Sequence, residues 1–369
     1  MTVPRVGYVG LDHVHRDAYF QIIDRLNVEL TALCEPYDDT NADDLRVPES
    51  RFDTLAVDFD LEQLLTGTKT HESVDALLES GSVDIVWVTL ANRDMPAVVE
   101  KAIDTGVHVF AEKPIARTAA ELRPTLERAR ASDVTVGTFF YYRNHPVSKK
   151  LRQLVDADFF GDLMAIDAHQ YATGLTKRDR SHYLYDREAS QGGVIQWIGV
   201  HWLDLLLYIL DDPITRVSAT LSSHSESVAV EDGATVSFET ASGAIGSFAT
   251  GYYLEEGGMR VDLSVHGESG RASAVVRDGP FVTEEPVKLD LHSTSAEWSG
   301  APHRTIGFDL DHSERPFGAF GLDFFQQFVE ACTGEGSPVA TIEDAYVALK
   351  VIDAIYEAAE QCGWRRVQT

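Results

Sequence analysis

The chain has 369 residues, of which 59 are acidic and 31 basic, giving a formal net charge of −28. This length suits two domains, each with its own core, better than one. A surface this acidic repels phosphate and the sequence contains no basic run, so nucleic-acid binding is not expected.

Lysine is scarce in this sequence, with 8 lysines beside 23 arginines. A net charge far from zero destabilises the compact state by self-repulsion, which concentrated counterions screen. The composition therefore predicts a protein of a salt-rich cytoplasm. An acidic surface that binds a partner is the alternative.

The cysteines Cys34, Cys332 and Cys362 are odd in number and far apart, which favours reduced thiols in a cytosol over a disulfide framework. We expect no export signal, because the first residues run straight into a strand pattern. The most apolar stretch, residues 194–210, carries three polar side chains and is short for a membrane span. It predicts a buried core helix. Together these features lead us to expect a cytoplasmic protein with no membrane partner.

Short apolar strands alternate with helical patterns over residues 1–140. The strands read RVGYVG, ELTALCE, VDIVWVTL, HVFAE and VTVGTFF. Such alternation predicts a doubly wound parallel sheet with helices on both faces and right-handed crossovers. The stretch VGYVGLDHVH at 6–15 resembles the start of a dinucleotide-binding fold in which glycines have been replaced.

A lysine follows the fourth of these strands, in the sequence AEKPIA at 111–116. The carboxyl end of a strand in an open α/β sheet faces the crevice where ligands bind, so Lys113 is a candidate for chemistry. Pro114 favours an extended conformation at Lys113, and the bond between them can be cis. A surface lysine before a helix-starting proline is the alternative.

Residues 141–369 have a different pattern and are expected to form a second, α+β domain. Beyond residue 210, alternating strands separated by turns predict a large, mostly antiparallel sheet with one face free for helices or a partner. The stretch 342–363 predicts a closing helix.

The apolar helix at 194–210 presents a second constellation. Gly193, Trp197, His201, Asp204 and Tyr208 recur at helical spacing and are expected to share one face. A buried His and Asp must be hydrogen-bonded or functional, because burying them unpaired costs about 1–3 kcal/mol. We expect a satisfied core pair for Asp204 and a functional role for His201.

Five motifs occur in an order typical of one family. They are EKP at 112–114, YYRNHP at 141–146, FFGDL at 159–163, GGVIQWIGVHWLD at 192–204 and DAYVALKVIDAIYEAAEQCG at 344–363. Together they resemble the glucose-fructose oxidoreductase and inositol dehydrogenase (Gfo/Idh/MocA) family nearly end to end. The resemblance implies an N-terminal Rossmann domain, an open C-terminal sheet that joins subunits in a homodimer or homotetramer, and NAD(P)-dependent hydride transfer from the CH–OH group of a sugar, polyol or related compound.

By this resemblance Lys113 and His201 are the catalytic residues. Lys113 matches a lysine that contacts substrate and cofactor and assists proton movement, and His201 matches a histidine near the reacting hydroxyl. A desolvated lysine or an imidazole can act as a base near neutral pH. The family's aspartate, four residues before the histidine, is Trp197 here.

The family's G-x-G-x-x-G/A fingerprint falls on Gly10, Asp12 and His15. Gly10 keeps the tight turn, whereas Asp12 places a carboxylate at an anion site unless it caps the backbone at the helix start. His13 and His15 can donate to the diphosphate, so a dinucleotide is still expected. A metal site on Asp12, His13 and His15 is the alternative, but no further ligands can be placed and none is expected.

Glu35 ends the second strand, where an acidic side chain accepts from the adenosine ribose and disfavours a 2′-phosphate. NAD is therefore expected rather than NADP; a turn residue before Pro36 is the alternative. The expected cofactor contacts are Gly10, Leu11, Asp12, His13, Glu35, Thr89, Leu90, Asn92, Glu112 and Lys113.

The substrate is expected to meet Arg143, Trp197, Lys113 and His201, together with the segment 174–191. That segment is rich in Arg, Tyr and His, a mixture suited to hydroxyls or a carboxylate. A solvated loop is the alternative. Two other functions remain open: a regulatory member that binds a dinucleotide or sugar without turnover, and an NAD-assisted hydrolase or lyase.

Thermal stability is expected to rise steeply with KCl up to molar concentrations, because added counterions screen the repulsion among the excess carboxylates. Melting temperatures measured across a KCl series check this expectation. A melting temperature that stays flat or falls over that range contradicts the salt-adapted interpretation.

Overall fold

The computed structural model describes residues 3–37, 60–175, 179–255, 258–277, 287–309 and 318–368. The chain forms two compact units. Unit 1 comprises Met1–Tyr141 and Ser313–Tyr346, and unit 2 comprises Tyr142–His312 and Val347–Thr369. The chain thus crosses from one unit to the other near residue 141, and a later segment returns to unit 1.

Unit 1 is built on a parallel sheet of six strands in the order β3-β2-β1-β4-β5-β6. The expected doubly wound sheet is therefore confirmed. All four residues of β4 are buried, as expected for a strand covered on both faces. The strands are β1 (Arg5–Val9), β2 (Glu29–Cys34), β3 (Lys69–Thr70), β4 (Ile85–Val88), β5 (His108–Ala111) and β6 (Val136–Thr138).

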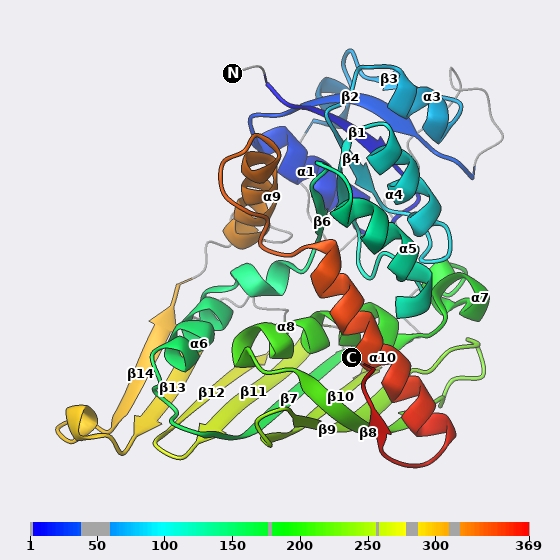
Figure 1. Cartoon of the computed structure of the whole chain (residues 1–369). Helices are drawn as coiled ribbons and strands as arrows, with labels where there is room; N and C mark the ends of the chain where they lie inside the picture. Colours follow the sequence, from blue (N-terminus) through cyan, green and yellow to red (C-terminus); the bar gives the residue numbers. More distant parts are fainter. Residues whose placement is uncertain are drawn as a thin grey trace. The chain divides into compact units, whose positions relative to one another are not determined.

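Helices cover both faces of this sheet, with α1 and α9 on one side and α3, α4 and α5 on the other (Figure 1). Side-chain caps begin two of them: Ser73 accepts from the backbone of Ala76, and Thr118 from that of Glu121. The helices of unit 1 are α1 (Arg16–Arg25), α2 (Leu61–Leu64), α3 (Val74–Glu79), α4 (Met95–Asp104), α5 (Ala119–Arg130) and α9 (Gly318–Cys332).

Aromatic packing explains why α9 belongs to unit 1. The ring of Phe325 lies 4.5 Å from that of Trp87 on β4, and Phe328 lies 4.8 Å from Phe110 on β5. Gly137 on β6 permits this approach, because a Cβ there would come within 2.6 Å of the Phe328 ring. Burial of large rings is the main stabilising term for such a contact.

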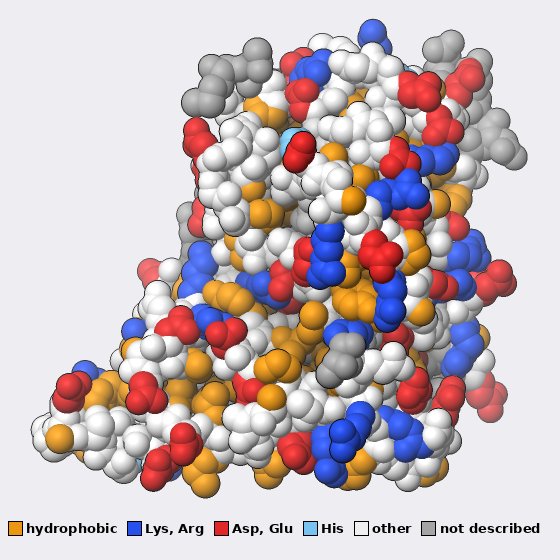
Figure 2. Space-filling view, viewed as in Figure 1, with side chains coloured by type: hydrophobic (Ala, Val, Ile, Leu, Met, Phe, Trp, Pro, Cys, Tyr) orange, Lys and Arg blue, Asp and Glu red, His pale blue; other side chains and the backbone are white. Residues whose placement is uncertain are grey.

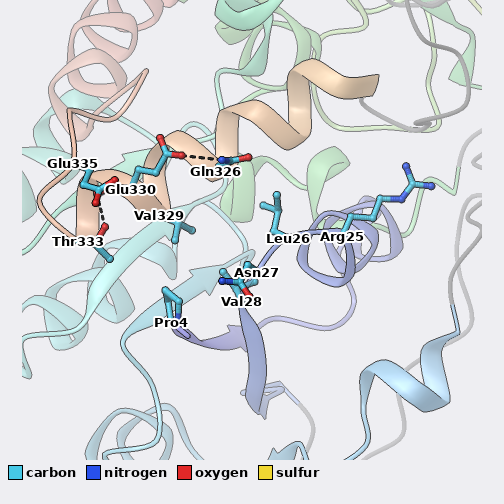
Figure 3. Close-up of a pocket in the computed structure, with 10 residues that line it drawn as sticks. All are labelled: Pro4, Arg25, Leu26, Asn27, Val28, Gln326, Val329, Glu330, Thr333 and Glu335. Atoms are coloured by element: carbon cyan, nitrogen blue, oxygen red, sulfur yellow. Dashed lines mark hydrogen bonds between the residues drawn. The ribbon is translucent and has the colours of Figure 1, made fainter. Parts of the chain in front are cut away.

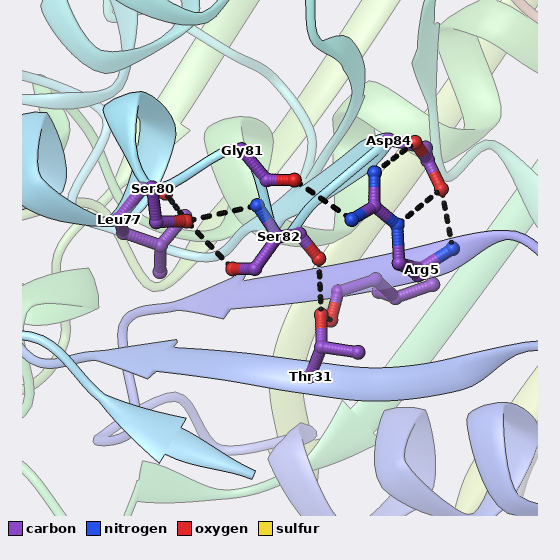
Figure 4. A network of polar contacts seen from close by, with 8 residues as sticks. Arg5, Thr31, Leu77, Ser80, Gly81, Ser82 and Asp84 are labelled. Atoms are coloured by element: carbon purple, nitrogen blue, oxygen red, sulfur yellow. Dashed lines mark hydrogen bonds and ion pairs between the residues drawn. The ribbon is translucent and has the colours of Figure 1, made fainter.

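An ion pair joins the amino ends of two neighbouring strands (Figure 4). The Arg5 guanidinium donates to both carboxylate oxygens of Asp84, at 2.7 and 3.0 Å, and lowers the pKa of that carboxyl. Arg5 also donates to the Gly81 carbonyl, and Thr31 on β2 donates to the Ser82 carbonyl at 2.8 Å. These bonds fix the register of β1, β2 and β4, so that their carboxyl ends meet at one edge.

Unit 2 is built on a nine-stranded sheet in the order β14-β13-β12-β11-β7-β10-β9-β8-β15. Every neighbouring pair is antiparallel except β7 and β10, which confirms the expected mostly antiparallel sheet. Helices α6 (Pro146–Asp156) and α8 (Val200–Leu210) lie on one face of it (Figure 1). The strands are β7 (Leu163–Thr173), β8 (Ile214–Ser222), β9 (Gly233–Thr240), β10 (Ile245–Leu254), β11 (Met259–Gly267), β12 (Gly270–Arg277), β13 (Val287–Ser293), β14 (His303–Phe308) and β15 (Arg365–Arg366).

The apolar helix expected at 194–210 is part of a longer helical run. Residues 187–210 are long and apolar enough to cross a membrane, but 89% of the apolar window is buried inside the protein, so this is a core helix. Its first part, α7 (Arg187–Ser190), ends at Gln191, whose φ is +74°. After the glycine pair the run continues through a π-helical turn at Ile195–Gly199 into α8. The expectation of one continuous α-helical face must be corrected, because a π-turn changes the rotation between residues on either side of it.

A buried carboxylate shapes the start of this run. Glu231 accepts from the backbone N–H of Ile195 and from the hydroxyl of Tyr356 on α10 (Ile342–Glu360), each at 3.0 Å. A Cβ at Gly192 would collide with the Tyr356 hydroxyl, and one at Gly193 with the Glu231 carbonyl. The glycine pair is therefore required by close packing.

On the face shown in Figure 2, acidic side chains are spread among basic ones, and the described residues form no single acidic patch there. Several carboxylates on the surface are paired with nearby cations, as Asp75 is with Lys101. Such exposed pairs contribute little to stability individually.

Gly193→Ala is expected to destabilise the protein by about 1–3 kcal/mol, because the added methyl group overlaps the Glu231 carbonyl. Urea unfolding measures this loss. Gly300→Ala is the matched control, since a Cβ at Gly300 meets nothing within 4 Å. Equal stabilities of the two variants would contradict the packing explanation.

Candidate functional site

The carboxyl ends of β1, β2, β4 and β5 bring four of the expected site residues to one edge of the sheet in unit 1. Gly10 follows β1, Glu35 follows β2, Thr89 follows β4 and Lys113 lies just beyond β5. This edge of an open parallel sheet is where ligands bind.

The turn at Gly10 can be made only by glycine. Its φ is +97°, and a Cβ would lie 2.5 Å from the Thr89 carbonyl oxygen. The Thr89 hydroxyl donates to the Gly10 carbonyl at 2.7 Å, and the Gly10 N–H donates to the Cys34 carbonyl at 3.0 Å. The turn is thereby held against the ends of both neighbouring strands, and the buried Leu90 and Asn92 follow Thr89.

Glu35 holds the residue that follows this glycine. One of its carboxylate oxygens accepts from the Leu11 N–H at 2.5 Å and the other from the Tyr37 N–H at 3.1 Å. Burial raises the pKa of Glu35, and the charge of Asp12 acts in the same direction. The acidic residue therefore organises the turn as well as ending β2.

Asp12 is not the N-cap residue of the first helix. Helix α1 begins at Arg16 with His15 as its N-cap residue, and the Asp12 side chain is exposed. Leu11 and His13 on either side of it are buried. The departure from glycine at position 12 thus places a carboxylate at the surface of the turn.

Arg16 lies beside the Gly10 turn and was not identified from the sequence. Its guanidinium is buried, donates to the Leu11 carbonyl at 3.0 Å and pairs with Asp17 at 2.6 Å. It brings a cation to the turn that carries Asp12, where it favours an anionic ligand. The sequence signal that could have identified Arg16 was a basic residue in the first turn of the predicted helix.

Lys113 is buried beside another charged group. Its Nζ lies 3.3 Å from a carboxylate oxygen of Glu112, and both side chains are at most 2% exposed. The peptide bond to Pro114 is cis. Burial lowers the pKa of Lys113 to about 8, against the opposing effect of Glu112. Burial also raises the pKa of Glu112. Lys113 is thus not the surface lysine of the alternative interpretation.

Tyr19 on α1 is a second residue that the sequence reasoning missed. Its hydroxyl donates to the other carboxylate oxygen of Glu112 at 2.5 Å. Tyr19 is fully buried and stacks on Trp87 with ring centroids 4.7 Å apart. The sequence separation of Tyr19 from Glu112 left no local signal of this contact.

In unit 2, Asp204 has the expected core partner, and the partner is Arg143. The guanidinium donates to both carboxylate oxygens, at 2.5 and 2.9 Å, and both residues are buried. The Arg143 guanidinium also lies 5.2 Å from the centre of the Tyr208 ring. Its substrate contact stays a prediction, since the structure shows this arginine first as the counter-charge of Asp204.

His201 is buried and stacks on Tyr142, with ring centroids 4.8 Å apart. Tyr142 accepts a hydrogen bond from the Gln170 amide at 3.3 Å, and Gln170 in turn accepts from the Trp202 indole. Trp197 lies on the π-turn and is also buried. The aromatic and amide contacts fix the ring of His201 within unit 2.

Two further expectations concern the segment 174–191 and a metal site. Residues 176–178 of the segment lie outside the described residues, whereas His182 is buried and caps a short 3₁₀ helix. Within the described ranges, no group of three or more His, Cys, Asp or Glu side chains could hold a metal ion.

A pocket of about 390 Å³ lies at the amino end of β1, in unit 1 (Figure 3). None of the expected site residues lines it. Its walls come from the end of α1, the turn before β2, and α9. They comprise Pro4, Arg25, Leu26, Asn27, Val28, Gln326, Val329, Glu330, Thr333 and Glu335.

Known proteins match the sequence over both units. The family model described as "Oxidoreductase family, NAD-binding Rossmann fold" matches residues 6–140, and that of the GFO/IDH/MocA C-terminal domain matches residues 148–273. The 1,5-anhydro-D-fructose reductase of Ensifer adhaerens is 28% identical over 79% of this chain and 82% of its own length. A D-xylose 1-dehydrogenase (NADP(+)) of Haloferax volcanii is 26% identical over 79% of this chain and 82% of its own.

Solved structures have the same fold. An oxidoreductase domain protein from Kribbella flavida is 19% identical, with a TM-score of 0.80 over 100% of both chains. A levoglucosan dehydrogenase in complex with NADH and levoglucosan is 17% identical, with a TM-score of 0.78 over 100% of both chains. The two family matches, in the order and at the positions of the two units, establish that the chain belongs to the Gfo/Idh/MocA family of NAD(P)-dependent oxidoreductases.

Proposed function

We propose that this protein is an NAD-dependent dehydrogenase that oxidises a secondary hydroxyl group of a sugar, polyol or related compound, with Lys113 as the base. The observation that carries the proposal is a buried lysine at the carboxyl edge of the sheet, beside Glu112 and with its pKa lowered to about 8. A lysine in this state can give up and take back a proton near neutral pH. The relatives named as sugar reductases and dehydrogenases support the substrate class.

The residues around Gly10 fit a dinucleotide. The absence of a Cβ at Gly10 keeps the turn close to the ends of β2 and β4, and Arg16 offers a cation beside it. Glu35 can accept from ribose hydroxyls and disfavours an added phosphate at the same place, which favours NAD over NADP. The bound nicotinamide supplies the hydride acceptor.

In this mechanism the neutral Nζ of Lys113 accepts the proton of the substrate hydroxyl as its C–H bond breaks. The protonated amine is then stabilised by the Glu112 carboxylate. His201 is proposed as a second proton-transfer group, on the strength of the family resemblance and of its fixed ring. Trp197 stands in place of a carboxylate, and an indole can stack on an apolar ring face, which favours a substrate less polar than a typical polyol.

We also propose that the nine-stranded sheet joins two or more copies of the chain. Its strands carry large exposed apolar side chains, including Ile245 on β10 and Val275 on β12, which are 61% and 50% exposed. Burying such side chains against a second copy is favourable.

The rate of oxidation is expected to rise with pH and level off above about 8, because only the neutral form of Lys113 accepts a proton. Lys113→Ala should lower turnover by about two to four orders of magnitude while changing NADH affinity much less, and His201→Ala should lower it by a smaller factor. Initial rates of NADH formation with a panel of sugars and polyols measure this. Lys101→Ala, which removes an exposed lysine on α4, is the control.

Turnover of Lys113→Ala at the parent rate would contradict the assigned base. A parent protein that binds NADH and a sugar but oxidises no alcohol would favour the regulatory function instead. NADH fluorescence in high salt detects the binding.

Glu35→Ser is expected to weaken NADH binding and to narrow the difference between NADH and NADPH, because the acceptor for the ribose is lost. Fluorescence titrations with both nucleotides measure the change. Glu35→Gln is a control for loop support, since its amide oxygen can still accept from the Leu11 N–H. Unchanged affinities for both nucleotides in Glu35→Ser would count against the assignment.

A further inference from the structure

Four polar side chains of unit 1 lie in a continuous line, each within 3.3 Å of the next. The Nζ of Lys113 lies 3.3 Å from one carboxylate oxygen of Glu112, and the Tyr19 hydroxyl donates to the other at 2.5 Å. The same hydroxyl lies 3.2 Å from Nδ1 of His15. The line therefore runs from the buried lysine to the loop that precedes α1.

Burial decreases along this line. Lys113, Glu112 and Tyr19 are at most 2% exposed, whereas His15 is only partly buried. A lysine that has accepted a proton in a buried place must release it before the next turnover. The partly buried imidazole of His15 at the far end of the line can exchange protons with water.

We propose that Lys113, Glu112, Tyr19 and His15 form a proton relay that carries the substrate proton to solvent during oxidation and returns a proton during reduction. This inference rests on the proposed function of Lys113. It assigns roles to Tyr19 and His15, and it accounts for the histidine at the last position of the altered glycine fingerprint.

In the oxidative direction the transfers are coupled and conserve protons. Lys113 passes its proton to the near oxygen of the Glu112 carboxylate, and the neutral carboxyl group then turns so that its O–H faces the Tyr19 oxygen. The Tyr19 hydroxyl turns from Glu112 toward His15 and gives its proton to Nδ1, while the Tyr19 oxygen takes the proton of Glu112. Nε2 of His15 releases a proton to water, and Glu112 is again a carboxylate. Reduction uses the same steps in reverse, so no oxidant or further reactant is needed.

The chemistry of the two inner groups suits this role. Burial raises the pKa of Glu112, so this carboxylate takes up a proton more readily than an exposed one. Burial also raises the pKa of Tyr19 well above its ordinary value. Tyr19 therefore stays a phenol and passes protons only in a concerted step.

Aromatic packing keeps the line in place. Tyr19 stacks on Trp87, and Phe139 meets its ring edge-on at 5.4 Å. The His13 ring stacks on the Tyr19 ring, with centroids 5.7 Å apart, and meets the His15 ring edge-on at 5.4 Å. The other titratable groups that act on Tyr19 and its neighbours are Tyr8 of β1, His13, Arg16, Asp17 and Tyr141.

The first test needs no substrate. Nitrogen NMR of the His15 ring is expected to show an inflection near pH 8, where Lys113 titrates. Tyr19→Phe should remove that inflection, because it deletes the bridging hydroxyl while leaving the through-space charge of Lys113 in place. Tyr8→Phe, which removes a buried hydroxyl outside the line, should retain it. An inflection that is missing from the parent, or that survives Tyr19→Phe, overturns the relay.

The second test uses turnover in weakly buffered solution. Tyr19→Phe and His15→Ala are each expected to lower kcat about tenfold or more, with KM within about twofold. Added imidazole should restore the kcat of His15→Ala, because imidazole can take the place of the missing ring. It should not restore the kcat of Tyr19→Phe, because the missing hydroxyl lies inside the protein. His71→Ala, a partly buried histidine outside the line, should neither lose activity nor respond to imidazole. Glu112→Gln interrupts the same line if Tyr19→Phe fails to fold.

The two tests separate failure of the relay from failure of the proposed function. Parent turnover that is unchanged in Tyr19→Phe and His15→Ala overturns the relay and leaves the dehydrogenase intact. A parent without turnover overturns the proposed function, and the NMR titration then decides alone whether the titration of Lys113 is coupled to His15 through the Tyr19 hydroxyl.

Discussion

The structure of unit 1 depends on one constraint, the burial of a lysine side chain. Removing the charge of Lys113 from solvent is costly, and the nearby carboxylate of Glu112 offsets that cost only partly. The carboxylate itself needs a donor, which Tyr19 supplies from α1. One desolvated charge thus ties the end of β5 to the first helix, and the aromatic rings of β4 and α9 complete the surroundings.

At the same edge of the sheet, the Gly10 turn is rigidly held and has charged side chains beside it. The turn at Gly10 is held by hydrogen bonds between its backbone and the side chains of Thr89 and Glu35. A larger residue at position 10 would collide with the Thr89 carbonyl and break this arrangement. Beside that turn lie the buried Arg16, which is paired with Asp17, and the exposed Asp12. The aspartate at the second fingerprint position therefore adds a negative charge at the surface of the turn.

Local patterns in the sequence were enough to predict the two sheets, the buried apolar helix and the need for a partner at Asp204. They were not enough to identify Arg143 as that partner, because the contact spans 61 residues and depends on tertiary packing. The contact between Tyr19 and Glu112 spans 93 residues and was missed for the same reason. The return of α9 to unit 1 also had no local signal, since its aromatic residues fit any amphipathic core helix.

The π-turn at Ile195–Gly199 has a consequence for how this chain can be aligned and altered. A π-turn amounts to one extra residue within an α-helix, and one residue corresponds to about 100° of helical rotation. Trp197 and His201, four positions apart in the sequence, are therefore related by a different rotation about the helix axis than the same spacing gives on a regular α-helix. Deleting a single residue from the turn would restore the regular winding and swing the glycine pair around the helix axis relative to His201. The extra residue of the π-turn thus sets the rotation about the helix axis between the residues before the turn and those after it. This rotation does not depend on which side chains those residues carry.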